Sequence, residues 1–93
     1  LSFPGLTISL EKYEVHFQGK LIEMPPKELE VLYFLAAHQN RVFTREQLLE
    51  QVWGFDFFGD SRTVDVHISG PGSESLGWQI RTVWGVGYKF EVK

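Results

Sequence analysis

Apolar residues recur at two different spacings along the chain, and each change of spacing marks the boundary of a predicted element. Near the N-terminus, β-prone runs alternate with turn-forming residues such as Gln18-Gly19-Lys20. The runs are Thr7–Ser9, Glu14–Phe17 and Leu21–Met24. Short strands separated by tight turns pair with one another, so this region predicts a small antiparallel sheet.

A first helix is predicted directly after this sheet, over Lys27–His38. Pro25-Pro26 cannot continue a strand, whereas proline is favourable at the first position of a helix. The apolar residues at helical spacing are Leu29, Leu32, Tyr33 and Ala36, and Val31, Phe34 and Leu35 widen the stripe. So wide an apolar stripe indicates a helix that is buried over much of its surface.

A second helix, about Arg45–Trp53, has the clearest local signature in the sequence. Thr44 is a favourable N-cap, and Gln47 three residues later completes a capping box. Phe43 precedes the cap and can pack back onto the first turn as a hydrophobic staple. Gly54 is suited to the backbone conformation that ends a helix.

A third helix is predicted to begin after a cap at Asp60 or Ser61, with Val64 and Ile68 one turn apart and facing inward. It ends at the glycine- and proline-rich run Ser69-Gly70-Pro71-Gly72-Ser73, which is a strong helix breaker.

The chain closes with two β-prone runs, Gln79–Val83 and Tyr88–Val92, joined by Trp84-Gly85-Val86-Gly87. A glycine-bearing turn between two such runs predicts a β-hairpin. The fold class is therefore α+β, with an N-terminal sheet, three helices and a C-terminal hairpin.

Composition narrows the possible functions. The 93 residues suffice for one domain, and the chain has no cysteine for a disulfide or a thiolate zinc site. No apolar run approaches the roughly 20 residues that span a bilayer, and no signal peptide is evident, so we expect a cytoplasmic protein without membrane contact. Because the formal net charge is −3, any binding to nucleic acid must come from a local basic patch.

Catalytic and metal-binding patterns are missing from the sequence. No serine lies in a nucleophile-elbow pattern, and His16, His38 and His67 fall in different predicted elements without metal-ligand spacing. Asp56, Asp60 and Asp65 lack the alternate spacing and the terminal Glu of an EF-hand, and Asp60 and Asp65 are expected to be a helix cap and a surface acid. We therefore expect neither an enzyme nor a bound metal or cofactor.

The order of the helices points to nucleic acid instead. A capped second helix followed by a third that presents Arg62, Thr63 and His67 outward resembles a helix-turn-helix, although the connection is longer than usual. The hairpin would be its wing. Such a unit lays the third helix in the major groove while other groups hold the phosphates.

Five motifs in this order resemble the effector domain of OmpR/PhoB-family response regulators, and most of all regulators of the ResD/SrrA type. They are Pro26-Lys27-Glu28-Leu29-Glu30-Val31-Leu32, Val42-Phe43-Thr44-Arg45-Glu46-Gln47-Leu48-Leu49, Val52-Trp53-Gly54, Arg62-Thr63-Val64-Asp65-Val66-His67-Ile68 and Thr82-Val83-Trp84-Gly85-Val86-Gly87-Tyr88-Lys89-Phe90. The resemblance implies a winged helix-turn-helix that binds double-stranded DNA sequence-specifically and controls transcription in a two-component system.

The resemblance also implies partners. A receiver domain, phosphorylated by a histidine kinase, precedes this domain in the family and controls its dimerisation on tandem or inverted DNA half-sites, and RNA polymerase is contacted. Nothing in the 93 residues resembles a receiver. We expect 1–93 to form a single DNA-binding domain in which 1–5 are the remainder of a linker.

The positions that the resemblance assigns to DNA fall into three groups. They are the phosphate contacts Trp53 and Arg62, the helix residues Thr63, Val66 and His67, and the backbone contacts Thr82 and Tyr88 beside the wing. Several have structural alternatives: Trp53 can belong to the core, Val66 can be an ordinary solvent-side residue, and Tyr88 can pack beneath the hairpin. Arg62 is favoured independently, because a cation at a helix start opposes the helix dipole but suits a phosphate.

Aromatic residues crowd the connection between the second and third helices, at Phe55, Phe57 and Phe58. The family contacts RNA polymerase at this place. Exposed phenylalanines reduce solubility unless they are used, so these side chains contact either polymerase, a neighbouring protomer or the core.

One departure from the family lies after Ile68. The family continues there with a basic stretch of about seven residues, or two turns of helix, whereas Ser69-Gly70-Pro71 follows at once here. Trp84 also occupies the wing tip, where some members carry arginine. The shortened third helix leaves an alternative function open, in which the same fold acts through protein contacts with weak or no DNA binding.

Overall fold

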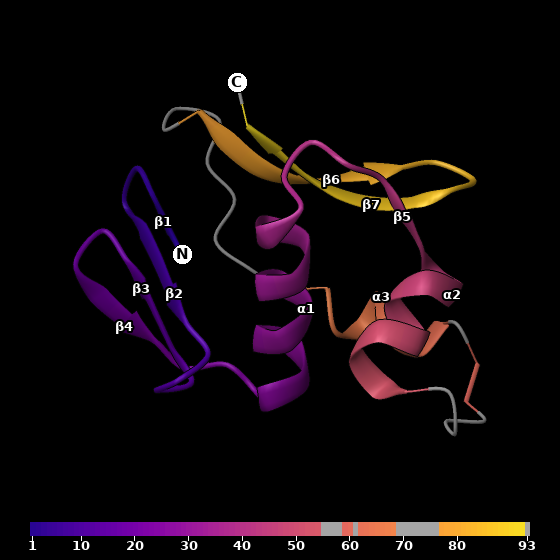
Figure 1. Ribbon diagram of the computed structural model, residues 1–93, viewed down its shortest axis with the longest axis horizontal. Coiled ribbons are helices and arrows are strands. Elements are labelled where there is room, and N and C mark those ends of the chain that lie inside the picture. The colour runs from indigo at the N-terminus through magenta and orange to yellow at the C-terminus, as the bar shows by residue number, and fades with distance from the viewer. Residues whose placement is uncertain (55–58, 61, 69–76, 93) are drawn as a thin grey trace.

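Figure 1 shows the computed structural model, which describes residues 1–54, 59–60, 62–68 and 77–92. The first sheet has four antiparallel strands in chain order, β1 to β4. They are β1 (Ser2–Phe3), β2 (Leu6–Ser9), β3 (Glu14–Phe17) and β4 (Lys20–Ile22). Leu6, Ile8 and Val15 are buried on the inner face of this sheet, as the period-two pattern of a half-buried sheet requires.

Helix α1 (Pro26–Ala37) packs between this sheet and the two short helices (Figure 1). It starts at the proline pair as predicted. Its buried side chains are Leu29, Val31, Leu32, Leu35 and Ala36. Burial of four large aliphatic side chains stabilises the fold by roughly 1.5 to 3 kcal/mol each, before the entropic cost of ordering them.

The predicted second helix forms in two parts, α2 (Arg45–Leu48) and the π-helix η1 (Leu49–Trp53). The capping box is confirmed: the Thr44 hydroxyl accepts a hydrogen bond from the backbone N–H of Gln47 at 3.1 Å, and the Gln47 side chain accepts one from the N–H of Thr44 at 2.9 Å. Gly54 ends the segment with a φ of 104°, a value that favours glycine.

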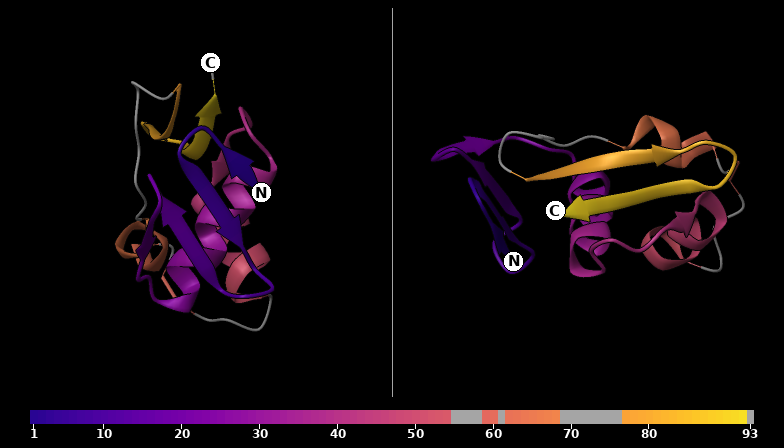
Figure 2. Two further views of the ribbon diagram at one scale, coloured as in Figure 1. Left: turned by 90° about the vertical axis from the view of Figure 1, so that its left-hand side faces the viewer. Right: turned by 90° about the horizontal axis from the view of Figure 1, so that it is seen from above.

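Helix α3 (Arg62–Val66) is only five residues long. Val64 is fully buried and Ile68 packs against the core, so both predicted inward positions are confirmed. The hairpin is also confirmed, with β6 (Trp78–Val83) paired to β7 (Gly87–Val92). In Figure 2 the hairpin runs along the long dimension of the molecule, and its turn lies at the end that carries α2 and α3.

Two features were not expected from the sequence. Residues 1–5, predicted as a linker remainder, include β1, which pairs with β2, and the Pro4 carbonyl accepts a hydrogen bond from the Trp78 indole at 2.8 Å. A further strand, β5 (Phe43–Thr44), pairs with β7 and makes the wing a three-stranded sheet of order β5-β7-β6. The predicted cap at Ser61 and the breaker run from Ser69 lie outside the described residues.

Candidate nucleic-acid interface

The N-terminus of α3 carries Arg62, the residue favoured most strongly for a phosphate contact. Asp60 caps this end: its Oδ1 accepts a hydrogen bond from the Arg62 N–H at 2.9 Å. Its Oδ2 accepts two more from the guanidinium, at 3.0 Å from Nε and 2.8 Å from a terminal nitrogen. The Arg62 side chain is 81% exposed. The guanidinium is therefore accessible, but it is already paired with a carboxylate of its own chain.

This pairing changes the ionisation of Asp60. The hydrogen bonds from Arg62 lower the pKa of the Asp60 carboxyl, and the same pair raises the pKa of Arg62. Both side chains are exposed to water, where an isolated ion pair is worth little. A phosphate can therefore replace Asp60 as the partner of Arg62 at small cost.

The other residues predicted on the third helix differ in exposure. Val66 is 71% exposed, whereas Thr63 and His67 are half-buried. The His67 Nδ1 lies 2.8 Å from the Thr63 carbonyl oxygen, so this nitrogen carries the proton and donates. Only Val66 presents most of its surface to solvent.

Trp53 lies at the junction of three helices and is half-buried. Its ring packs edge-on against His67, with centroids 5.1 Å apart. The Lys27 ammonium lies 6.0 Å from the ring centroid and donates a hydrogen bond to the Val52 carbonyl at 2.9 Å. Trp53 therefore packs against His67, just after α3, and also borders a cation, while its predicted phosphate contact stays a prediction.

Tyr88 and Thr82 face each other across the wing but differ in exposure. Thr82 is exposed, whereas Tyr88 is buried beneath the hairpin, as the structural alternative supposed. The Tyr88 hydroxyl donates a hydrogen bond to Asp65 Oδ1 at 2.5 Å. Burial, and then this bond, raises the pKa of Tyr88 to about 12. The hydroxyl is thus directed at α3 rather than at solvent.

Asp65 was predicted to be a surface acid, which the structure corrects. Its carboxylate accepts from Tyr88 and lies 3.4 Å from Nε of Arg45, so it joins β7, α3 and α2. The missed signal is weak: an acid and a base stand on neighbouring helices, but nothing local shows that they meet. The sequence pattern indicated no contact for Asp65 and did not single out Arg45.

The wing tip is apolar and exposed. Trp84 is 90% exposed and Val86 is 47% exposed. Behind the tip, Gly87 lies so close to β5 that an added Cβ would sit 1.9 Å from the Phe43 carbonyl oxygen. The wing is therefore held against the start of α2 by a contact that only glycine allows.

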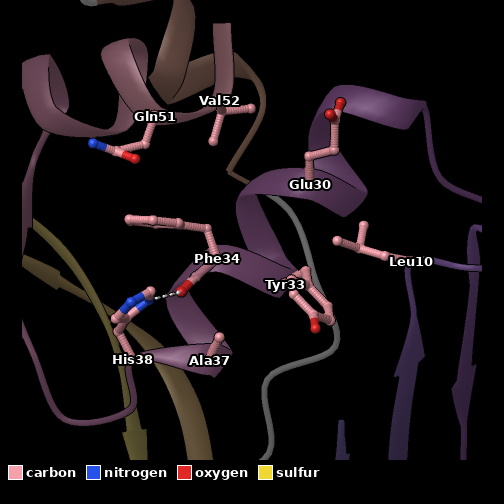
Figure 3. Close-up of a pocket in the computed structure, with 8 residues that line it drawn as sticks. All are labelled: Leu10, Glu30, Tyr33, Phe34, Ala37, His38, Gln51 and Val52. Carbon is pink, nitrogen blue, oxygen red and sulfur yellow. Dashed lines mark hydrogen bonds between the residues drawn. The ribbon is translucent and has the colours of Figure 1, made fainter. Parts of the chain in front are cut away.

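A groove of about 250 Å³ lies away from these residues, between α1 and η1 (Figure 3). Leu10, Glu30, Tyr33, Phe34, Ala37, His38, Gln51 and Val52 line it. None of the predicted DNA contacts is among them. Among the described residues no group of acids and histidines could hold a metal ion, and no described helix is long and apolar enough to cross a membrane.

Three helices with a β-hairpin wing, preceded by an antiparallel sheet, define a winged-helix domain. Residues 19–90 match the family described as "Transcriptional regulatory protein, C terminal". The chain is 45% identical over 98 residues to the transcriptional regulatory protein ResD of Bacillus subtilis, covering 99% of this chain and 41% of ResD. It is 43% identical over 99 residues to SrrA of Staphylococcus aureus, covering 100% of this chain and 41% of SrrA.

Solved structures show the same fold. The response regulator DrrB of Thermotoga maritima, an OmpR/PhoB homologue, superposes with a TM-score of 0.81 at 36% identity over 98% of this chain and 43% of DrrB. The DNA-binding domain of CpxR from E. coli gives 0.82 at 27% identity over 99% of this chain and 95% of that domain. The chain belongs to the OmpR/PhoB family and has its C-terminal winged-helix fold. This is a family of transcription regulators rather than of enzymes.

The chain is shorter than its curated relatives, both overall and within the aligned region. It spans about two fifths of the length of ResD and of SrrA. The SrrA alignment runs over 99 positions, whereas this chain has 93 residues, so at least six aligned positions have no counterpart here. That difference is close to the stretch expected to be missing after Ile68.

Proposed function

We propose that this domain binds double-stranded DNA sequence-specifically through α3 and the wing, and so controls transcription as the effector domain of a response regulator. One observation carries the proposal: the winged-helix fold and the motifs of the family are retained over nearly the whole chain. The DNA-binding domain of RstA from Klebsiella pneumoniae, solved in complex with the RstA box, superposes with a TM-score of 0.80 at 29% identity over 98% of this chain and 95% of that domain.

The accessible groups divide by role. Arg62 and Thr82 are exposed polar groups suited to phosphates, which set the register of the protein on DNA. Val66 is the exposed apolar side chain of α3, and an apolar residue suits the thymine methyl group at a base edge. Trp53 is half-buried and borders the same surface, where it is placed to contact the DNA phosphate backbone.

Arg62→Ala is expected to weaken binding to specific and unrelated duplexes by the same factor, because a phosphate contact carries no sequence information. The slope of log K against log salt should fall by about 0.9. Fluorescence anisotropy at several salt concentrations measures both quantities. A changed preference at one base pair would show instead that Arg62 reads a base.

Asp60→Asn is the matched variant for this test. The amide oxygen can still cap the Arg62 N–H, while the charge that competes with phosphate is removed. Binding should tighten by a few-fold at most, since an ion pair exposed to water is weak. The tightening should vanish in the Asp60→Asn, Arg62→Ala double variant.

Partners follow from the same family. We propose that the domain follows a receiver domain in the full-length protein and that a histidine kinase phosphorylates this receiver. The domain then binds its DNA half-sites as a dimer, in the cytoplasm. ResD, SrrA and DrrB support this, because each extends well beyond the part that this chain matches.

The proposed polymerase or protomer contact at Phe55, Phe57 and Phe58 lies outside the described residues. Replacing Phe57 and Phe58 with Ser is expected to reduce transcription activation several-fold while DNA affinity is kept, because a surface contact can be lost without the core. In vitro transcription and anisotropy on one sample separate the two. Unfolding without any such separation would place these rings in the core.

A second function, docking through protein contacts with little DNA binding, is favoured by the short α3 and by the missing alignment positions. Salt distinguishes the two. DNA binding through phosphates weakens steeply between 50 and 200 mM salt, whereas an apolar protein contact does not.

A further inference from the structure

Three elements of the interface meet at one carboxylate. Asp65 is on α3, Tyr88 is on strand β7 of the wing, and Arg45 opens α2. The Tyr88 hydroxyl donates to Asp65 Oδ1 at 2.5 Å, and Arg45 Nε lies 3.4 Å from the same oxygen. The Asp65 and Arg45 side chains are 35% and 41% exposed, and Tyr88 is 8% exposed.

The Tyr88 bond is the stronger of the two contacts. It is short, its acceptor is a carboxylate, and its donor belongs to a buried side chain, all of which strengthen a hydrogen bond. The Arg45 contact is longer and half exposed, so it contributes less. Tyr88 itself cannot shift easily, because its ring is buried and β7 is paired on both sides.

Helix α3 needs such a contact because it is short. Five residues form little more than one helical turn, which is unstable alone. Within α3, Val64 is the one fully buried side chain. Val64, together with Ile68 just after the helix, holds one face of α3 to the core, but apolar packing is not directional. A directional contact from Asp65 to the wing fixes the orientation of α3 relative to the hairpin.

We propose that Asp65 is a positioning residue that fixes the angle between α3 and the wing, with Tyr88 as its main partner. Asp65 touches no DNA in this role; it sets where Arg62 and Val66 stand relative to Thr82. The inference rests on the proposed DNA binding for its functional consequence, but the geometry it describes exists without DNA.

Charge alone predicts the opposite result, which makes the inference testable. Asp65 places a negative charge on the helix that approaches phosphates, so removing that charge should strengthen binding if electrostatics alone operated. Asp65→Ala and Asp65→Asn remove the same charge. Only Asp65→Asn keeps an oxygen that can accept the Tyr88 hydrogen bond.

The positioning role therefore predicts a split between the two variants. Asp65→Ala should bind duplex DNA about tenfold more weakly than the parent, the factor expected from one hydrogen bond to a charged group. Asp65→Asn should bind as tightly as the parent or more tightly. Equal strengthening by both variants would overturn the proposal, and so would equal weakening.

Tyr88→Phe supplies an independent arm that changes no charge. It should weaken binding by the same factor as Asp65→Ala, and the double variant should be no weaker than either single one. Tyr13→Phe is the control, since Tyr13 is 51% exposed and its hydroxyl makes no hydrogen bond in the described part of the chain. Additive losses in the double variant would contradict the shared contact.

A measurement without DNA separates failure of this inference from failure of the proposed function. Because the chain has no cysteine, spin labels can be attached through Val66→Cys on α3 and Val86→Cys at the wing tip. The distance distribution between the labels should be narrow in the parent and in Asp65→Asn, and broader or shifted with Asp65→Ala or Tyr88→Phe. If the distance distribution is the same in all variants, the proposal is wrong even when the parent binds DNA. If the parent does not bind DNA but the variants differ in this way, the proposed positioning role stands and the proposed DNA binding fails.

Discussion

Inserting a basic stretch of about seven residues between Ile68 and Ser69, some two turns of helix, is expected to tighten DNA binding by roughly a hundredfold to a thousandfold at physiological salt. The present α3 is five residues long and ends at Val66, so it offers one exposed apolar side chain and one arginine to a duplex. The added segment would bring three or four cations. Each neutralised phosphate contributes about 0.9 to the salt slope, or somewhat less than tenfold in affinity at physiological salt.

Base readout should return together with affinity. Arginine placed in the major groove discriminates one base from another by about 1 to 3 kcal/mol per bidentate contact. The segment to graft is an arginine- and lysine-rich amphipathic stretch of about seven residues, as the family resemblance implies at this place. A second graft of equal length, with its cations replaced by glutamine, separates helix length from charge. If both grafts bind alike, or neither improves on the parent, phosphate contacts are not what this chain lacks.

The second large effect concerns Gly87, where alanine is expected to lower the free energy of unfolding by about 3 kcal/mol or more. The new Cβ would lie 1.9 Å from the Phe43 carbonyl oxygen and 2.8 Å from the Thr44 Cα, both backbone atoms that cannot rotate away. Relief requires β5 and β7 to separate, which removes the wing from the start of α2. Urea denaturation monitored by circular dichroism measures the change.

Gly85→Ala is the matched control, two residues away in the same turn. Its Cβ would meet nothing within 4 Å, but its φ is +77°, which costs a residue with a side chain about 1 to 2 kcal/mol. Gly87→Ala should therefore cost clearly more than Gly85→Ala. If Gly85→Ala cost more stability than Gly87→Ala, β5 would be able to move away from β7 at little cost, and this contact would not fix the wing.

Local chemistry made much of this fold predictable. The capping box at Thr44, the proline start of α1 and the cap at Asp60 each involve residues within a few positions of one another, and all three are observed. Hydrophobic spacing likewise located Val64 and the hairpin. Such signals are carried by the sequence itself, because the interacting groups are already neighbours along the chain.

Features that depend on distant segments could not be predicted in the same way. Strand β5 is two residues long and exists only because β7 pairs with it. Asp65 stands where any surface acid could stand, and its role depends on Tyr88, 23 residues further along the chain. Residues 2 and 3 lack a strand pattern of their own and pair because β2 offers an open edge.

The family resemblance indicated the residues of a candidate interface but not the contacts among them. Tyr88 was carried over as a DNA contact, yet its hydroxyl is directed at α3. Arg62 was favoured as a phosphate ligand, and its pairing with Asp60 is a competitor that no motif indicated. Motif positions specify which residues stand near the ligand, whereas burial and partners decide what each can offer to it.

The π-helical turn at Leu49–Trp53 has a consequence for insertions and deletions. A single π turn is equivalent to one residue inserted into an α-helix, and here the Gly54 N–H reaches back five residues to the Leu49 carbonyl at 3.1 Å. The helix absorbs the extra residue as a bulge, so the capped start at Thr44 and the contact of Trp53 with His67 keep their places. A chain one residue shorter in this segment could join the same two ends by a continuous α-helix, which makes η1 a point where length can vary without moving the interface.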